Sequence, residues 1–288
     1  MFGLINLDKP AGPTSHDMVA RIRRLAPRRT KVGHAGTLDP FATGVLVVCL
    51  GPATRLADYV AAHAKRYEAE ITFGAMSTTD DPAGTLTETH RPAPSAEDLR
   101  EALVAFVGEI EQVPPAHSAV HVNGQRAYAL ARARKPVNLS ARVVRVDAVA
   151  LLAVDGPRAR VRIDCGKGTY IRSIARDLGA RLGCGAYCSA LRRTAVGAFT
   201  IDDAVDPDVL TRETLDHYVR PARLAVADLP AITLDAAGLA NVLHGRGVPC
   251  RETAGEVAAL DETERLVALG SVRNGLFQPA KVFHADPI

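Results

Sequence analysis

Polar and apolar residues alternate most regularly between Arg66 and Phe73. Odd-numbered positions from 67 to 73 are apolar, and even-numbered positions from 66 to 72 are polar or charged. A period of two predicts a strand with one buried face. Shorter apolar runs at residues 2–7 and 45–50 predict two further strands that lie in the interior.

Three other segments repeat their apolar residues every three or four positions, which is the period of a helix with one buried face. The first begins at Ser15 and ends near Leu25, and the second begins at Ser95 and stops before Gly108. Because a serine hydroxyl accepts a hydrogen bond from a free amide of the first turn, Ser15 and Ser95 are the predicted N-caps. A third helix is expected over residues 169–182.

Turn signals divide the remaining apolar runs into hairpins. Asn-Gly or Asp-Gly pairs at 123–124, 155–156 and 274–275 favour two-residue turns. Strands and helices follow one another irregularly, so a repeating βαβ pattern is not supported. We predict an α+β fold with a mixed, largely antiparallel sheet flanked by helices. The prolines at 221 and 230 mark an expected boundary, and the tail beyond it is expected to form a small β-rich domain.

The composition is that of a globular protein, with 288 residues of which 47% are hydrophobic and 23% charged. No stretch approaches the roughly 20 apolar residues that a membrane span needs. The first ten residues lack the features of a secretory signal, so we expect a cytoplasmic protein. The 5 cysteines are scattered and odd in number, which favours reduced, buried thiols over a disulfide framework. We expect a monomer without an obligatory protein partner.

Positive charge is segregated along the chain, although the net charge is only +3. Residues 21–31 hold six Lys and Arg and no acid, and residues 112–146 hold another six, again without an acid. These twelve cations exceed the net charge by nine, so the rest of the chain is net negative. Such segregation favours binding of a polyanion such as nucleic acid. The alternative is that both stretches form solvated basic faces.

A segment punctuated by glycine and proline at residues 33–44 carries the most informative carboxylate, Asp39. Pro40 disfavours helical backbone at Asp39, and the flanking glycines allow a close approach to another backbone. Taken alone, an Asp-Pro pair most often organises a turn.

The sequence GHAGTLDPFATG at residues 33–44 resembles the catalytic loop of the TruB-type tRNA pseudouridine synthases, whose pattern is GHxGxLDPxATG. Further segments resemble that family's motifs in the same order: LDKP at 7–10, KRY at 65–67, residues 114–119 and 124–131, GKGTYIR at 166–172, and LRRT at 191–194. One departure is Thr78, which stands where the family often has aspartate and puts a contact of the substrate loop in doubt.

The resemblance implies the pseudouridine-synthase fold for residues 1–225, with an RNA-clamping insertion at about 112–146, and a PUA-like RNA-binding domain at 226–288. It implies that uridine 55 in the T-loop of tRNA is isomerised to pseudouridine after the base is flipped out, without a cofactor or a metal. Asp39 would be the catalytic carboxylate, as nucleophile or base. Arg172 would pair with it, and Tyr67 would stack on the target base.

The resemblance assigns roles to several more residues. His34 would fill the space that the flipped nucleotide leaves, and Leu191 would form an apolar wall of the pocket. Tyr170 would support the same pocket, and Lys9 would contact phosphate or brace the catalytic loop. The expected contacts of the insertion to the T-arm come from Arg126, Arg132 and Arg134.

Other classes of function have weaker support. A hydrolase with two carboxylates needs a second acidic motif, and residues 161–169 do not satisfy the P-loop pattern because residue 161 is valine. Cys184 and Cys188 have the spacing of half a zinc site, but no second pair follows closely. The alternatives left open are a non-catalytic RNA-binding or RNA-chaperone protein with this fold, and the same isomerase acting on a different RNA.

Overall fold

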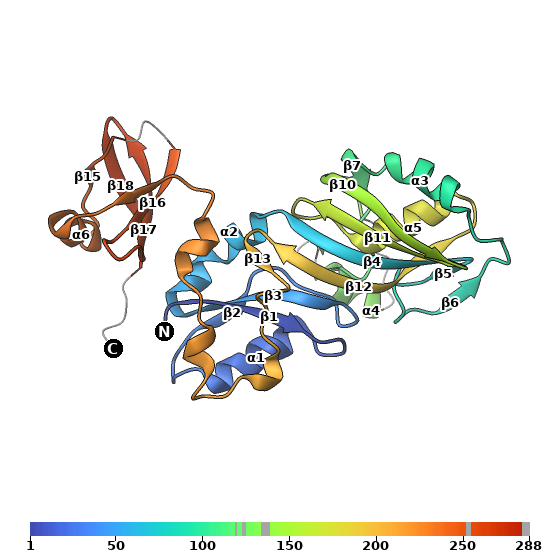
Figure 1. The fold of residues 1–288 in the computed structure, drawn as a ribbon, viewed down its shortest axis with the longest axis horizontal. Coiled ribbons are helices and arrows are strands. Elements are labelled where there is room, and N and C mark those ends of the chain that lie inside the picture. Colours follow the sequence, from blue (N-terminus) through green and yellow to red (C-terminus); the bar gives the residue numbers. More distant parts are fainter. Residues whose placement is uncertain (119, 123–124, 134–138, 252–254, 284–288) are drawn as a thin grey trace.

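The computed structural model of the chain describes residues 1–283 except 119, 123–124, 134–138 and 252–254, and is centred on one large sheet (Figure 1). Its main path has the order β1-β3-β12-β4-β11-β10-β7, with β2 beside β3 and β13 beside β12. The bounds of these strands are β1 Gly3–Lys9, β2 Val32–His34, β3 Thr43–Leu50, β4 Lys65–Phe73, β7 Gly108–Gln112, β10 Arg142–Asp155, β11 Arg158–Cys165, β12 Ala186–Val196 and β13 Phe199–Thr200.

The described pairs of this sheet are antiparallel except for β12 with β3. That parallel contact is short, with Arg192 opposite Thr43 and Arg193 opposite Gly44. Gly44 has a φ of 99°, and a Cβ at this position would lie 2.2 Å from the carbonyl oxygen of Arg193. A glycine is therefore needed where the N-terminal strands join the rest of the sheet. The prediction of a mixed, largely antiparallel sheet is confirmed.

Helices cover the sheet where the sequence places their apolar stripes. The helical bounds are α1 Ser15–Leu25, α2 Ala57–Ala62, α3 Ala96–Val104, α4 Ala127–Arg132, α5 Ile171–Arg181 and α6 Ala236–Leu243, with 3₁₀ segments η1 Gly51–Leu56, η2 Pro207–Val209, η3 Leu215–Tyr218 and η4 Ala222–Val226. Helix α5 packs on β12, and α3 packs on β10 and α5. The longest of the described helices have 11 residues, and none of them has the length and apolarity to cross a membrane.

The helix caps differ from the predictions in one place. Ser95 caps α3 as expected, and a capping box links it with Asp98. Helix α1 is capped by Thr14 and Asp17, so the prediction of Ser15 as its cap is wrong. Thr14 takes over the cap because the hydroxyl of Ser15 points inward, where it bonds both the amide and the carbonyl of Leu38.

Most predicted strands and turns are present. The alternation at 66–73 forms β4, whose apolar side chains are buried. The turn at 155–156 joins β10 to β11, and the turn at 274–275 joins two strands of the tail with positive φ at both residues. The turn predicted at 123–124 lies outside the described residues. Two short sheets are separate from the main one: β5 Ala75–Ser77 pairs with β6 Leu86–Glu88, and β8 His121–Val122 pairs with β9 Gln125–Arg126.

A second sheet occupies the tail, in the order β14-β16-β17-β18-β15. Its strands are β14 Ala231–Thr233, β15 Val248–Pro249, β16 Gly255–Leu260, β17 Leu266–Arg273 and β18 Leu276–Val282. One face packs with α6 around its own buried cluster. The other face joins a cluster that it shares with β1, β3 and η1, including Val47, Leu56, Val226, Leu269 and Phe283.

Polar contacts also connect this tail sheet to the N-terminal half. Tyr59 of α2 donates a hydrogen bond to the carboxylate of Glu256, and Lys281 donates to the Tyr59 hydroxyl over 3.2 Å. Arg55 donates to the carbonyl of Val282 over 2.7 Å and lies over the ring of Phe283. The tail is therefore docked on the first half of the chain through both apolar and polar contacts.

Candidate active site

The segment between β2 and β3 that carries Asp39 is held by three side chains from other elements. Ser15 of α1 bonds the backbone of Leu38 on both sides, over 2.9 and 3.0 Å. Lys9, at the end of β1, donates to the carbonyls of Pro10 and Pro13 over 2.8 Å and to that of Pro40 over 3.3 Å. The guanidinium of Arg193 reaches the carbonyl of Gly36 over 3.0 Å.

Asp39 and Arg172 form a two-contact ion pair. Nε of Arg172 lies 2.9 Å from Oδ2 of Asp39, and Nη2 lies 3.2 Å from Oδ1. The Arg172 side chain is 3% exposed, whereas that of Asp39 is 33% exposed. The carboxylate is thus oriented from behind by a buried cation while one side of it stays accessible. This is the arrangement that a carboxylate needs to meet a substrate.

Further acceptors fix Arg172 itself in the first turn of α5. Its Nη1 lies 3.0 Å from Oδ2 of buried Asp81 and 2.9 Å from the carbonyl of Thr79, and its Nη2 donates to the carbonyl of His117 over 2.9 Å. The guanidinium of Arg172 thus contacts four residues from three segments of the chain, and these contacts together fix its position. The loop at 77–84 therefore contacts the candidate catalytic pair directly.

Thr78 has a structural role in that loop. Its amide donates to the carbonyl of Thr85, and its hydroxyl accepts from the amide of the same residue over 3.0 Å. The threonine thus closes the loop that holds Asp81.

The protonation of Asp39 depends on opposing effects of burial and of the neighbouring charges. Burial raises the pKa of Asp39 above its usual value, and the Arg172 guanidinium lowers it. The nearby Asp81 carboxylate raises the pKa of Asp39, while Lys9 lowers it. Because Asp39 is paired on both oxygens and one-third exposed, we expect it to be ionised at neutral pH.

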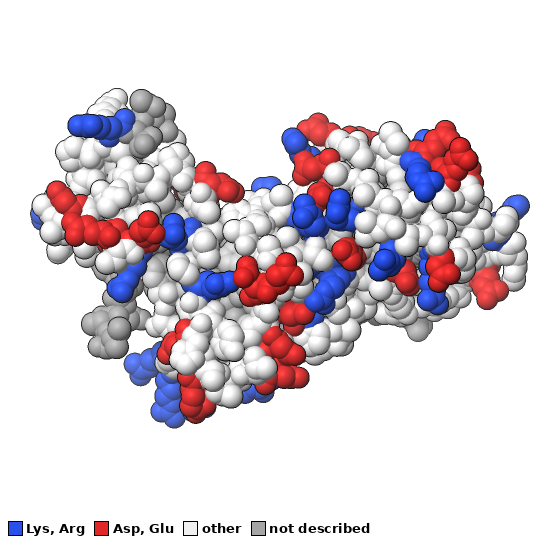
Figure 2. All heavy atoms as spheres, in the orientation of Figure 1, with Lys and Arg blue, Asp and Glu red and all other residues white. Residues whose placement is uncertain are grey.

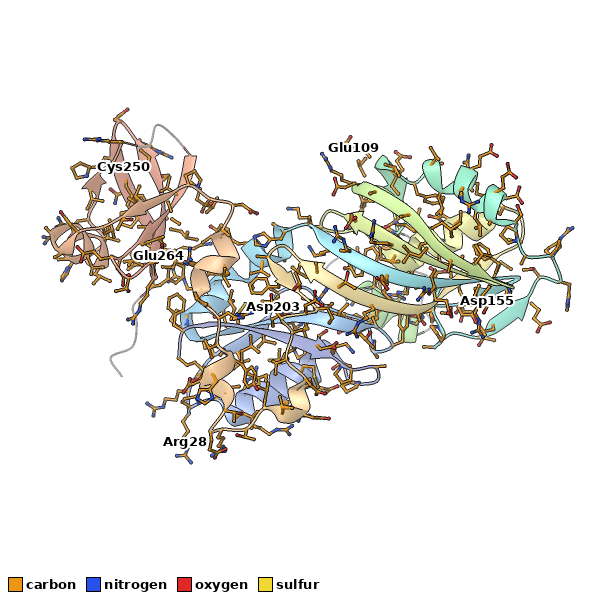
Figure 3. All side chains as sticks on the ribbon, in the orientation of Figure 1. Arg28, Glu109, Asp155, Asp203, Cys250 and Glu264 are labelled. Atoms are coloured by element: carbon orange, nitrogen blue, oxygen red, sulfur yellow. The ribbon has the colours of Figure 1, made fainter. Side chains whose placement is uncertain are left out.

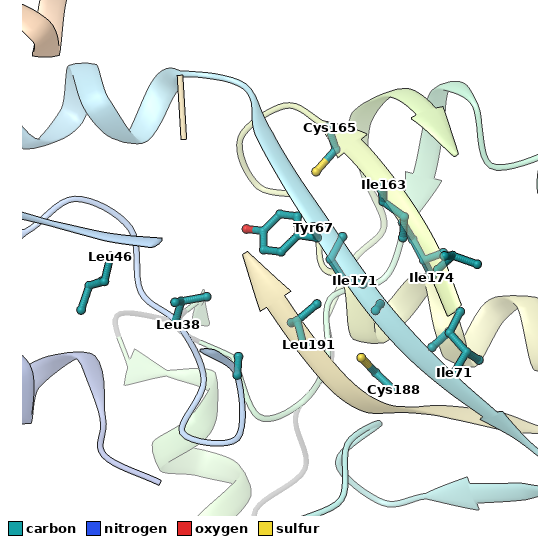
Figure 4. Close-up of a cluster of buried hydrophobic side chains, with 14 of the residues drawn as sticks. Leu38, Leu46, Tyr67, Ile71, Ile163, Cys165, Ile171, Ile174, Cys188 and Leu191 are labelled. Atoms are coloured by element: carbon teal, nitrogen blue, oxygen red, sulfur yellow. The ribbon is translucent and has the colours of Figure 1, made fainter. Parts of the chain in front are cut away.

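Tyr67 and Leu191 lie in the same buried cluster next to the Asp39 segment. Figure 4 shows the Tyr67 ring on β4 with its phenol oxygen directed towards the segment that carries Leu38, and Leu191 on the adjacent strand β12. Both side chains are 7% exposed. Burial raises the pKa of Tyr67, and the Arg193 guanidinium beside it opposes that rise.

Two histidines meet where α1 faces β2. The rings of His16 and His34 are 5.8 Å apart in an edge-to-face arrangement. Burial lowers the pKa of His34, and the neighbouring His16 and Arg193 lower it further, which favours the neutral ring. His34 Nδ1 is buried and has no hydrogen-bond partner among the described residues.

Lys9 is completely buried, so its geometry favours the bracing role over direct contact with phosphate. Burial lowers the pKa of Lys9 to about 8, although nearby Asp39 opposes the shift. Tyr170 immediately precedes α5 and is held by its backbone, because its amide and carbonyl both bond the side chain of Gln112. Of the three arginines predicted for the insertion, Arg126 belongs to β9 and Arg132 to α4, whereas Arg134 lies outside the described residues.

The described ranges contain no group of three or more His, Cys, Asp or Glu that could hold a metal ion. Cys184 and Cys188 are buried free thiols, and burial raises the pKa of Cys188 strongly. Their surroundings are those of packed core thiols.

Sequence reasoning missed three residues that position the candidate site. The sequence motifs gave no role to Asp81 or Arg193, and they predicted Ser15 only as a helix cap. Arg193 is 1% exposed and bonds the carbonyls of Val45 and Gly36 over 2.7 and 3.0 Å. An arginine between alternating strand residues is a usable signal, because a buried position for it requires several acceptors.

Comparisons with known proteins identify the family of the chain. Residues 23–171 match the model of the N-terminal domain of the TruB family of pseudouridylate synthases, and residues 172–227 match the tRNA pseudouridylate synthase B C-terminal domain. The chain therefore belongs to the TruB family of pseudouridylate synthases, a family of isomerases.

Relatives match over nearly the full length. The chain is 47% identical to tRNA pseudouridine synthase B of Thermobifida fusca (strain YX), covering 98% of each chain, and 40% identical to the protein of that name from Ruegeria sp. (strain TM1040), covering 99% of this chain and 96% of the relative. Among solved structures it resembles a Cbf5-Nop10-Gar1 complex, with a TM-score of 0.74, 29% identity and coverage of 98% and 85%. The predicted pseudouridine-synthase fold is confirmed.

Proposed function

We propose that the protein converts uridine 55 in the T-loop of tRNA to pseudouridine, with Asp39 as the catalytic carboxylate. The observation that carries this proposal is the ion pair of a buried Arg172 with a partly exposed Asp39, within a chain of the TruB family. Relatives named tRNA pseudouridine synthase B support tRNA as the substrate.

The reaction breaks the bond between N1 of uracil and C1′ of the ribose and forms a bond between C5 and C1′. C5 loses a proton and N1 gains one, so neither oxidation nor hydrolysis occurs. An ionised Asp39 serves as nucleophile at C1′ or as base at C2′, and both routes need the carboxylate that Arg172 orients.

The target base would enter the site by flipping out of the T-loop. Tyr67 supplies an aromatic face and a phenol, and Leu191 supplies an apolar surface on the adjacent strand. His34, which we infer to be neutral, would fill the space that the base leaves without placing a charge there. These side chains belong to β2, β4 and β12 of the main sheet.

RNA outside the target base would be held by two parts of the chain. We assign the T-arm contacts to the insertion at about 112–146, through Arg126, Arg132 and Arg134. The tail, residues 226–288, would be a PUA-like domain that adds affinity without chemistry. We further propose that the enzyme acts as a monomer without a protein partner.

The decisive experiment maps pseudouridine in an unmodified tRNA transcript incubated with the pure protein and EDTA. We expect modification at position 55 alone, with full activity in the chelator. Modification at another position of the tRNA would contradict uridine 55 as the target. Activity that returns only with zinc would contradict a metal-free reaction. Binding of the transcript without pseudouridine would favour the second candidate, a non-catalytic RNA-binding protein.

A further inference from the structure

A concave site lies at the C-terminal end of α1, and Asp39 is not among the residues that line it. It is a cavity of about 1050 Å³ formed by the end of α1, the connection to β2, and residues of η3 and the segment before it. Six of the side chains that line it are cationic: Arg23, Arg24, Arg28, Arg29, Lys31 and Arg212. The acidic residue among the lining side chains is Asp216.

Among the residues that the structure describes, no carboxylate pairs with these cations. Within the described ranges, none of the six forms an ion pair, although Arg21 one turn earlier pairs with Asp208 over 2.6 Å. Arg23 donates to the carbonyl of Val32 over 3.2 Å. All six residues are exposed, so their charge faces water and is available to a ligand.

Compensation of the helix dipole explains only part of this cluster. Arg23 and Arg24 occupy the last turn of α1, where cations are favourable. Arg28, Arg29 and Lys31 follow the helix, and Arg212 comes from a segment far along the chain. Two separate segments therefore supply cations to one wall, which is what a ligand with repeated negative charge requires.

Position relates the cavity to the candidate active site. The N-terminal end of α1 touches the catalytic segment through Ser15 and Leu38. The helix then rises by about 12 Å from Ser15 to Arg23, the first residue of α1 that lines the cavity. Figure 2 shows Lys and Arg gathered at the lower left of the molecule, where Figure 3 labels Arg28 beneath α1.

We propose that this cavity binds backbone phosphates of the tRNA body outside the T-arm while the target uridine occupies the Asp39 site. The proposal rests on the proposed function for its choice of RNA. A small anion is a poorer match, because the exposed arginines form a broad surface, whereas phosphates along a strand meet several cations at once.

The test compares wild type with the double variant Arg28→Gln/Arg29→Gln, using full-length tRNA and an isolated T-arm hairpin. Dissociation constants are measured at several salt concentrations. We expect the double variant to bind full-length tRNA about tenfold more weakly. The negative slope of log affinity against log salt should become shallower by about 1.5. Hairpin binding should be unchanged.

A matched control removes the same charge elsewhere. Arg100→Gln/Arg181→Gln changes two exposed arginines on α3 and α5, at the other end of the main sheet from α1 (Figure 1). We expect this control variant to bind full-length tRNA and the hairpin with the affinities and the salt dependence of wild type. Arg212→Gln tests the distant segment and should give a smaller effect of the same kind.

Equal weakening of the hairpin and full-length tRNA would overturn the assignment to RNA outside the T-arm. An unchanged slope with both RNAs would mean that the cavity is only a solvated surface. The proposed function is judged separately by pseudouridine formation in wild type, which fails or succeeds without reference to these variants. At saturating tRNA the single-turnover rate of Arg28→Gln/Arg29→Gln should equal that of wild type.

Discussion

The two arginine-rich regions of this protein use the same side chain in opposite ways. At the Asp39 site, Arg172 and Arg193 are 3% and 1% exposed, and each bonds several acceptors from distant segments. At the end of α1, Arg28 and Arg29 are exposed and have no ion-pair partner in the described part of the chain.

Burial and pairing decide what each arginine can do. A guanidinium surrounded by acceptors holds one geometry, and removing it leaves those acceptors unsatisfied in the interior. An exposed guanidinium keeps its rotamers and its charge for a partner in solution, and its contribution is screened by salt. The first kind suits orientation of a reacting carboxylate, and the second suits attraction of a polyanion.

Replacing the carboxylate itself should have the largest effect. We expect Asp39→Asn to lower the single-turnover rate of pseudouridine formation by about 1000-fold or more, because the amide is neither base nor comparable nucleophile. Affinity for tRNA should change by less than about threefold, since phosphate contacts supply most of it. The control Asp164→Asn breaks a surface ion pair with Arg66 and should keep its rate. A rate near wild type in Asp39→Asn would remove this carboxylate from the mechanism.

The buried arginine should tolerate little change. Arg172→Lys keeps the charge but loses the fork, so we expect a rate about 100-fold lower. Because Arg172 lowers the pKa of Asp39, weakening that contact should raise this pKa. The rate should then fall at a higher pH than in wild type as the solution is acidified. The same change one turn on, Arg176→Lys, alters a pair with Asp80 and should cost less than about threefold. Equal losses of rate in Arg172→Lys and Arg176→Lys would contradict a specific role of Arg172 in orienting Asp39.

The second buried arginine acts on the loop and on the phenol together. Arg193→Gln should slow the reaction about tenfold, because it loosens the hold on the Gly36 carbonyl. The pKa of Tyr67 should rise further, which NMR of labelled tyrosine measures. Arg192→Gln is the matched control, since Arg192 is the neighbour of Arg193 in the chain. The Arg192 side chain is 41% exposed and pairs with Asp8. If the pKa of Tyr67 is the same in Arg193→Gln and in wild type, the Arg193 guanidinium does not influence the Tyr67 phenol.

The smallest effect concerns the stability of the loop support. The pKa of Lys9 is lowered from 10.5 to about 8 in the folded protein by burial. Between these values the unfolded chain binds more protons, so the free energy of unfolding should rise with pH. Relative to Lys9→Met, wild type should gain up to about 1 kcal/mol between pH 8 and pH 9, measured by urea denaturation. The pKa of Lys65 is lowered by a similar amount, but Lys65 is present in both proteins, so its contribution cancels in the difference between them. Parallel pH profiles of the two proteins would mean that the Lys9 ammonium titrates normally.

Local sequence predicted much of the fold because periodicity reports which face of an element is buried. The alternation at 66–73 and the spacing of α5 were sufficient to place β4 and that helix. The cap of α1 was mispredicted because either Thr14 or Ser15 could accept the first-turn amide, and only packing against Leu38 directs Ser15 inward.

For the candidate site, the sequence by itself determined the chemical groups: a carboxylate in an extended, glycine-flanked loop, a tyrosine on the buried face of a strand, and two acid-free basic stretches. The family resemblance assigned Arg172 to Asp39 but gave Arg193 no role, and only the tertiary structure supplies the acceptors that surround both buried arginines. Arg172 meets Asp39 and Asp81, and Arg193 reaches the same loop, only after β12 has paired with β3 and β4. The reason is physical: the charge of an arginine is fixed by its chemistry, but its burial and its partners come from chain segments that local sequence does not specify.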